Sequence, residues 1–148
     1  MDILRKGLVV RTNWSGQDFL NISKRMEKYD YSIDIKKIDL ENLRSFLDVK
    51  GNLMLRLLEN PNLLEHGAFA ELLRAVFHLR EELMNRDDMS RLPDTDYAHL
   101  AGDIKRAYIL LSRQWLEYMK HLKDNYPYLF SLAMRTNPFD KDASPIVK

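Results

Sequence analysis

The chain has no cysteine among its 148 residues, and it has only five glycines. The lack of cysteine excludes disulfides, thiolate metal sites and a cysteine nucleophile, and it suits a reducing compartment. The few glycines form neither a Gly-x-Gly-x-x-Gly turn nor a Walker A loop, and Gly-x-Ser-x-Gly is also missing. The sequence therefore predicts neither a phosphate-binding loop nor a serine-hydrolase elbow.

Long hydrophobic runs are missing as well. The densest apolar stretch, residues 53–64, is interrupted by Arg56, Glu59 and Pro61. It falls short of the roughly 18 to 20 apolar residues that a membrane-spanning helix needs. Residues 1–10 contain no apolar run of signal-peptide length. We therefore expect a cytoplasmic protein without direct membrane insertion.

The chain also lacks an excess of charge of either sign. The 23 Lys and Arg residues against 22 Asp and Glu residues give a formal net charge of +1. The short basic clusters, such as Lys36-Lys37, are interleaved with acidic residues, which is typical of a solvated surface. Nucleic-acid binding domains usually carry a basic face, so no nucleic-acid partner is predicted.

The strongest pattern that is present is an uninterrupted helical one over residues 94–124. Its apolar residues recur at steps of three and four, which places them on one wide stripe of a helix. Such a stripe has to be buried against other helices. The stripe consists of Tyr97, Leu100, Ala101, Ile104, Ala107, Tyr108, Leu111, Trp115, Tyr118, Met119 and Leu122.

Two further helical segments precede this one. The first covers residues 39–60 and is interrupted at Gly51. At this position a kink, a close helix crossing and a merely tolerated glycine all stay open. Pro61 ends the segment and favours the first turn of the next one, over residues 61–85, from which Gly67 can split a first turn.

These segments predict an all-α fold, namely an antiparallel helical bundle of three main helices over residues 39–60, 61–85 and 94–124. A short docked helix follows near residues 128–135. The predicted division is an N-terminal arm over 1–38, the bundle over 39–139 and a disordered polar tail over 140–148.

Four histidines are the candidate metal ligands. His78 with Glu82, and His99 with Asp103, are each four residues apart and can share a helix face. Such pairs are most often surface hydrogen bonds, and this reading is favoured over metal ligation. The Glu-x-x-His pattern of di-iron bundles and the His-Glu-x-x-His motif do not occur. We therefore predict no metal, no cofactor and no catalytic residue.

Aromatic residues gather around two prolines near the C-terminus. They either dock on the bundle, which is favoured, or form a surface for a partner. The candidate interaction surface consists of Tyr126, Tyr128, Phe130 and Phe139. The aromatic residues of the long helix, Tyr108 and Trp115 among them, are spaced as core residues, with a ligand cavity as the alternative.

Several strings resemble the soluble region of a family of prokaryotic ion-channel-like proteins. They are residues 49–66 (VKGNLMLRLLENPNLLEH), 75–79 (AVFHL), 125–133 (NYPYLFSLA) and 135–139 (RTNPF). The resemblance covers roughly residues 29–139 and transfers no functional residue. It implies association with a two-helix, potassium-channel-type pore. This chain holds neither pore helices nor a Thr-Val-Gly-Tyr-Gly filter, so we expect that it does not conduct ions itself.

Together these observations favour a non-enzymatic cytosolic interaction or regulatory domain. Its expected partner is another protein or a second copy of the chain, with a membrane channel as the partner that the resemblance implies. The alternative is a small-ligand or metal sensor built inside the helical bundle. An enzyme is the least favoured function, because no carboxylate pair shows the marks of a catalytic cleft.

Overall fold

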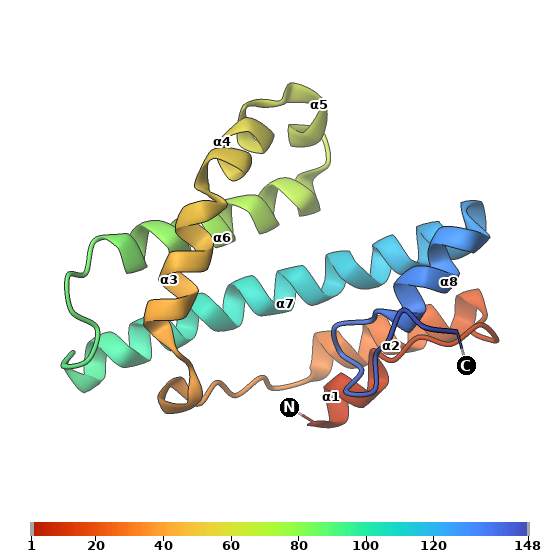
Figure 1. The fold of residues 1–148 in the computed structure, drawn as a ribbon, viewed down its shortest axis with the longest axis horizontal. Coiled ribbons are helices and arrows are strands. Elements are labelled where there is room, and N and C mark those ends of the chain that lie inside the picture. Colours follow the sequence, from red (N-terminus) through yellow and green to blue (C-terminus); the bar gives the residue numbers. More distant parts are fainter. Residues whose placement is uncertain (1, 148) are drawn as a thin grey trace. The chain divides into compact units, whose positions relative to one another are not determined.

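The computed structural model describes the backbone of residues 2–147, and the side chains in that range other than those at positions 2–4 and 64. This part of the chain is helical and contains no strand, which confirms the predicted all-α class (Figure 1). The elements are α1 (Asp2–Gly7), α2 (Gly16–Lys28), the 3₁₀ turn η1 (Ile35–Lys37), α3 (Leu40–Val49), α4 (Gly51–Glu59), α5 (Pro61–Leu64), α6 (Gly67–Met84), α7 (Asp94–Asn125) and α8 (Pro127–Arg135).

The chain divides into two compact units. A central unit consists of residues 32–111, and a terminal unit joins residues 1–31 to residues 112–148. Helix α7 contributes its first part to the central unit and its second part to the terminal unit. This division differs from the predicted arm (1–38), bundle (39–139) and tail (140–148).

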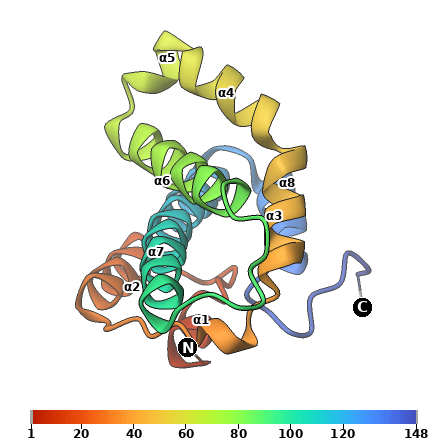
Figure 2. The ribbon, with the colours of Figure 1, turned by 90° about the vertical axis from the view of Figure 1, so that its left-hand side faces the viewer.

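The central unit is held together by one apolar core. Helices α3 and α4 both pack against α6. Figure 2 shows α6 nearly end-on, with α3, α4 and α5 forming an arc around it. Burying a leucine side chain contributes on the order of 2 kcal/mol, so these contacts fix the helices firmly. The core consists of Leu40, Leu47, Leu79, Leu83, Met89, Leu100 and Ala107.

Both predicted interruptions occur in the central unit. The segment predicted over residues 39–60 is two helices, because α3 ends at Val49 and α4 begins at Gly51. A Cβ atom at Gly51 would lie 2.6 Å from Arg80 Nε on α6, so the Arg80 side chain lies directly against this glycine. The segment predicted over residues 61–85 is likewise divided, with α6 beginning at Gly67.

The terminal unit explains why residues 1–31 are not a separate arm. Leu8, Phe19 and Met26 are buried in it. The buried side chain of Asn137 donates a hydrogen bond from Nδ2 to the carbonyl oxygen of Leu8 at 2.9 Å. Burial of these apolar residues ties the first 31 residues to the last part of the chain.

The predicted polar tail makes defined contacts as well. The Ser144 backbone N–H donates to the Arg135 carbonyl oxygen at 2.8 Å, and the Arg135 guanidinium donates to the carbonyl oxygen of Pro145. Lys148, the last residue of that predicted tail, lies outside the described residues. None of the helices in the described part of the chain combines the length and the apolar character that crossing a membrane requires.

Candidate metal centre

Four side chains from two helices of the central unit bring metal-ligating atoms together. His78 and Glu82 lie one turn apart on α6, and His99 and Asp103 lie one turn apart on α7. One donor atom from each residue lies within 4.8 Å of the donor atoms of the other three. The favoured interpretation of the sequence, two separate surface pairs, is incomplete, because the fold merges them into one cluster.

The antiparallel packing of α6 and α7 produces this arrangement. His78 is opposite Asp103, with Nε2 and Oδ2 3.4 Å apart, and Glu82 is opposite His99, with Oε1 and Nε2 3.4 Å apart. Because a residue and its i+4 neighbour share a helix face, two such pairs meet when two helices pack antiparallel in this register. Leu79, Leu83 and Leu100, which neighbour the ligands in sequence, belong to the core.

The distances fit the coordination sphere of a small divalent ion. Within each helix His78 Nε2 lies 3.5 Å from Glu82 Oε1, and His99 Nε2 lies 3.4 Å from Asp103 Oδ2. All four nitrogen–oxygen distances are longer than a good hydrogen bond. A tetrahedral zinc site with bonds of about 2.0–2.1 Å has ligand–ligand edges of about 3.3–3.4 Å. The four nitrogen–oxygen separations match four of the six edges of such a sphere, and the other two donor pairs lie within 4.8 Å.

Asp103 supplies a second sign that the cluster is a site. Its Oδ2 atom is buried and accepts no hydrogen bond from the described part of the chain. A buried acceptor without a hydrogen bond is unfavourable by about 1–3 kcal/mol, and an ion is one of the ordinary explanations. The imidazoles of His78 and His99 are each 49% exposed, so an ion can reach the cluster from solvent.

Arg86 orients the Glu82 carboxylate and favours its ionised form. Arg86 Nη1 donates to Glu82 Oε2 at 2.8 Å, which leaves Oε1 facing the histidines. The hydrogen bond from Arg86 is the largest of the causes that hold the pKa of Glu82 below its usual value. Glu82 is therefore ionised at neutral pH, which is the form that binds a metal ion.

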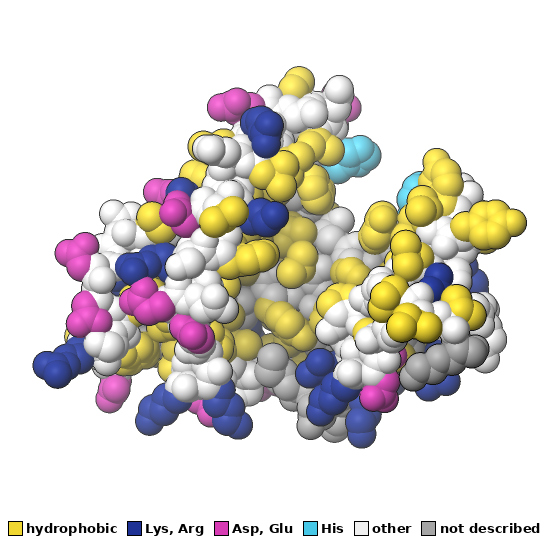
Figure 3. Space-filling view, in the orientation of Figure 1, with side chains coloured by type: hydrophobic (Ala, Val, Ile, Leu, Met, Phe, Trp, Pro, Cys, Tyr) yellow, Lys and Arg dark blue, Asp and Glu magenta, His cyan; other side chains and the backbone are white. Residues whose placement is uncertain are grey.

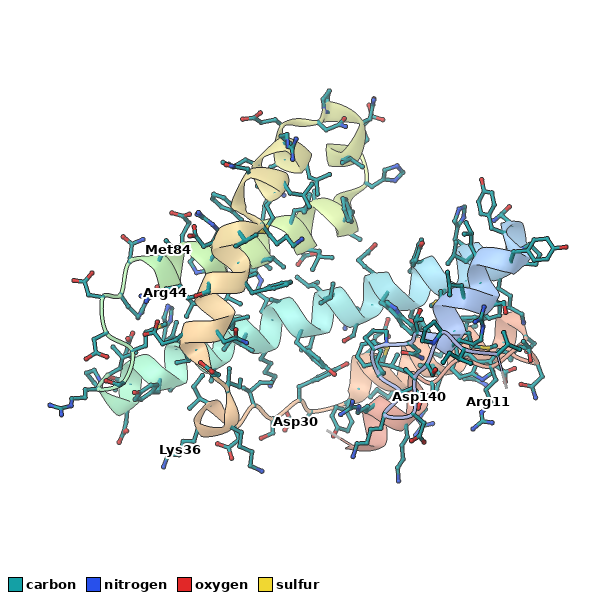
Figure 4. The ribbon with its side chains drawn as sticks, in the orientation of Figure 1. Arg11, Asp30, Lys36, Arg44, Met84 and Asp140 are labelled. Carbon is teal, nitrogen blue, oxygen red and sulfur yellow. The ribbon has the colours of Figure 1, made fainter. Side chains whose placement is uncertain are left out.

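Arg86 is itself held from two sides. Its Nε and Nη2 atoms donate to the two carboxylate oxygens of Asp96 at 2.7 and 2.6 Å, and this pairing lowers the pKa of Asp96. Arg44 on α3 donates from Nη1 to the Arg86 carbonyl oxygen at 2.7 Å. Figure 4 shows Arg44 beside the end of α6 that is labelled at Met84. Such outer partners orient the ligands of a metal site.

The donor set indicates which ions the cluster suits. Two imidazoles with two carboxylates favour zinc and its first-row neighbours. Magnesium and calcium prefer sites made of oxygen atoms alone. The remaining histidines do not take part, because His66 precedes α6 and His121 lies near the end of α7, in the terminal unit.

The predicted interaction surface divides into two kinds of residue, all in the terminal unit. Phe130 is buried, and Phe139 packs edge-on against Trp115 with ring centroids 5.1 Å apart. Tyr126 and Tyr128 are exposed, at 52% and 92%. Phe130 and Phe139 therefore pack within the terminal unit. Of the four predicted residues, Tyr126 and Tyr128 are accessible to a partner.

A groove of about 930 Å³ lies elsewhere on the central unit. It is lined by apolar side chains from residues 33–40 and by Met89, Tyr97 and Ala101, with Asp39 and Asp94 among its polar residues. The sequence left a ligand cavity near Tyr108 and Trp115 open as an alternative. Neither residue lines this groove. None of the four residues of the histidine–carboxylate cluster lines this groove.

A family model described as "Uncharacterized protein MJ1433, C-terminal helical domain" matches residues 1–135. A relative with the name "Uncharacterized protein MJ1433", from Methanocaldococcus jannaschii, is 51% identical over 137 residues. The match covers 93% of this chain and 56% of that relative, so the chain spans little more than half of its length. No solved structure matches the chain. Neither description names an ion channel, and the resemblance to channel-like proteins stays a prediction.

Proposed function

We propose, from the premise that this chain belongs to the MJ1433 C-terminal helical domain family, that it is a metal-binding helical domain. Its ion is a divalent first-row transition metal, with Zn²⁺ the best fit. The ligands are His78, Glu82, His99 and Asp103. The observation that supports this proposal is the set of four nitrogen–oxygen distances of 3.4–3.5 Å, which match four of the six edges of a tetrahedral coordination sphere.

The arrangement is suited to binding more than to catalysis. Four protein ligands fill a tetrahedral sphere, whereas catalytic zinc sites keep one position open for water or substrate. The ligands also come from two packed helices, which the ion would cross-link across the connector of residues 85–93. We therefore propose a non-enzymatic role in which metal occupancy stabilises one arrangement of α6 and α7.

The role in the cell extends this proposal. A cytoplasmic regulatory domain whose input is a metal ion combines the function that the sequence favours, an interaction module, with its alternative, a metal sensor. A protein partner would then respond to the packing of α6 against α7. A membrane channel as that partner is a prediction that depends only on the resemblance of the sequence strings.

The test is direct titration of the protein with Zn²⁺ by calorimetry, after treatment with a chelator and without a polyhistidine tag. We expect one ion per chain. His78→Ala and His99→Ala each remove a ligand and should weaken binding by at least about 10–100-fold, the effect that loss of even an outer partner has. His66→Ala and His121→Ala are the matched controls and should bind as the natural chain does.

Titration with Co²⁺ checks the geometry independently, because tetrahedral Co²⁺ absorbs visible light far more strongly than the octahedral ion. An intense visible spectrum that is lost in His78→Ala is the expected result. Absence of stoichiometric binding, or equal weakening in His66→Ala, would show that the cluster is only a set of surface pairs.

A further inference from the structure

The outer face of α8 is an apolar surface that the described residues of the terminal unit leave largely exposed. Tyr128, Leu129 and Leu132 are 92%, 54% and 44% exposed. At 100° per residue these three positions lie within one third of the helix circumference. Figure 3 shows hydrophobic side chains gathered over α8. Most apolar residues of a surface helix in a globular protein lie on its buried side. An apolar stripe on the outer side is therefore unusual.

The opposite face of the same helix is anchored. Phe130 is buried, and Met134 is half-buried on that side. The Phe130 N–H donates to the Tyr126 carbonyl oxygen at 2.9 Å, which closes the first turn after Pro127. The outer stripe is therefore presented by a helix that its own unit holds in place, and little ordering entropy is lost when it binds.

The charge of this helix indicates what covers it. No Asp, Glu, Lys or Arg occurs between Asn125 and Met134. A partner surface with charged groups would leave them buried and unpaired against this stripe, which is unfavourable. A second copy of the same stripe brings no charged group to the interface, because it is equally apolar. A stripe that pairs with its own copy is also the self-complementary patch that two-fold pairing needs.

We propose that two copies of this chain associate through the outer faces of their α8 helices, packed antiparallel about a two-fold axis. Tyr128 and Leu132 lie nearest the axis in this arrangement, with Leu129 beside them. The three side chains expose on the order of 100 Å² each and bury about 600 Å² per dimer, to which their neighbours add, so the interface is smaller than a standard specific one. The dimer is therefore weak, with a dissociation constant on the order of micromolar or higher.

The first experiment is sedimentation velocity on the chain from about 5 µM to about 1 mM, a range that spans such affinities, with a chelator present. We expect the 17.6 kDa monomer at the low end and a species of twice that mass at the high end. Tyr128→Glu and Leu132→Glu should each shift the association to at least ten-fold higher concentration. Val49→Glu, at an exposed apolar residue of the central unit, is the control and should not shift the association.

A second measurement does not depend on the charged variants. Because the chain has no cysteine, Leu132→Cys carries a single thiol, and mild oxidation should link two copies through it. Val49→Cys should remain unlinked under the same conditions. A monomer at every concentration overturns the proposal, and so does association that the α8 variants leave unchanged. A tetramer as the smallest assembly also contradicts it, and the channel resemblance predicts this result because potassium-channel-type pores have four-fold symmetry.

Discussion

Metal-dependent stability is the prediction that tests the candidate centre most completely. The perturbation is the addition of Zn²⁺ to chelator-treated protein. An ion that binds the folded chain alone stabilises it by RT ln(1 + [L]/Kd), which is about 2.7 kcal/mol at a free concentration of 100 times Kd. All four ligands lie in the central unit, on helices that share its core, so the ion and the core stabilise the same packing.

The magnitude follows from the size of the chain. For about 150 residues, 1 kcal/mol shifts the midpoint of thermal unfolding by about 2–4 °C. We therefore expect an increase of about 5–11 °C at 100-fold excess over Kd, measured by circular dichroism or calorimetry. Hydrogen exchange should slow most in α6 and in the part of α7 before residue 112, because the ion cross-links these segments.

Two controls make this experiment decisive. The double variant His78→Ala and His99→Ala should show no zinc-dependent increase, whereas His66→Ala should keep it in full. Mg²⁺ should have little effect, since it prefers oxygen ligands. An unchanged midpoint for the natural chain, or the same increase in the double variant, would refute the reasoning from the ligand distances.

The remaining predictions concern residues around the centre and the contact between Gly51 and Arg80. Arg86→Gln should weaken Zn²⁺ binding by about 10–100-fold, as calorimetry would show, while Arg74→Gln, at an exposed position of α6, should not. Glu82 and Asp96, the two carboxylates that Arg86 contacts, have lowered pKa values. Their pairing with Arg86 therefore stabilises the folded chain above a pH of about 4, and this stabilisation is lost as the pH falls through the lowered pKa values. Urea unfolding should thus show the natural chain and Arg86→Gln converging in acid; a gap that persists there contradicts the pairing. Gly51→Ala should destabilise the natural chain because its Cβ meets the Arg80 guanidinium, and should cause less harm in an Arg80→Ala background. A coupling energy of about 0.5–3 kcal/mol in a double-mutant cycle is expected, and simple additivity would contradict the contact between Gly51 and the Arg80 side chain.

Local signals in the sequence were sufficient to predict most helices. Pro61 and Gly67 mark the starts of α5 and α6, and the long apolar stripe predicts α7 to within one residue at its end. Caps and helix breakers act through backbone geometry and hydrogen bonds within a few residues. These effects do not depend on the rest of the chain, and the sequence displays them directly. The sequence predicts the interruption at Gly51, but only the structure shows that the Arg80 side chain lies against this glycine.

The ends of the chain were harder to predict. Their segments read as an arm and a tail because nothing within them specifies a distant partner. The hydrogen bond from Asn137 to the Leu8 carbonyl oxygen joins residues 129 positions apart. Contacts of this range depend on the path of the whole chain, and the spacing of apolar residues does not encode them.

The candidate metal centre shows the same limit at the level of function. The sequence by itself determined the all-α class, the absence of thiolate chemistry and the two pairs His78–Glu82 and His99–Asp103, because composition and the 3.6-residue period are local properties. Only the tertiary structure decided that the pairs face each other. The register of α6 against α7 follows from side-chain packing in a shared core, and a slip of one turn would separate the ligands by about 5 Å.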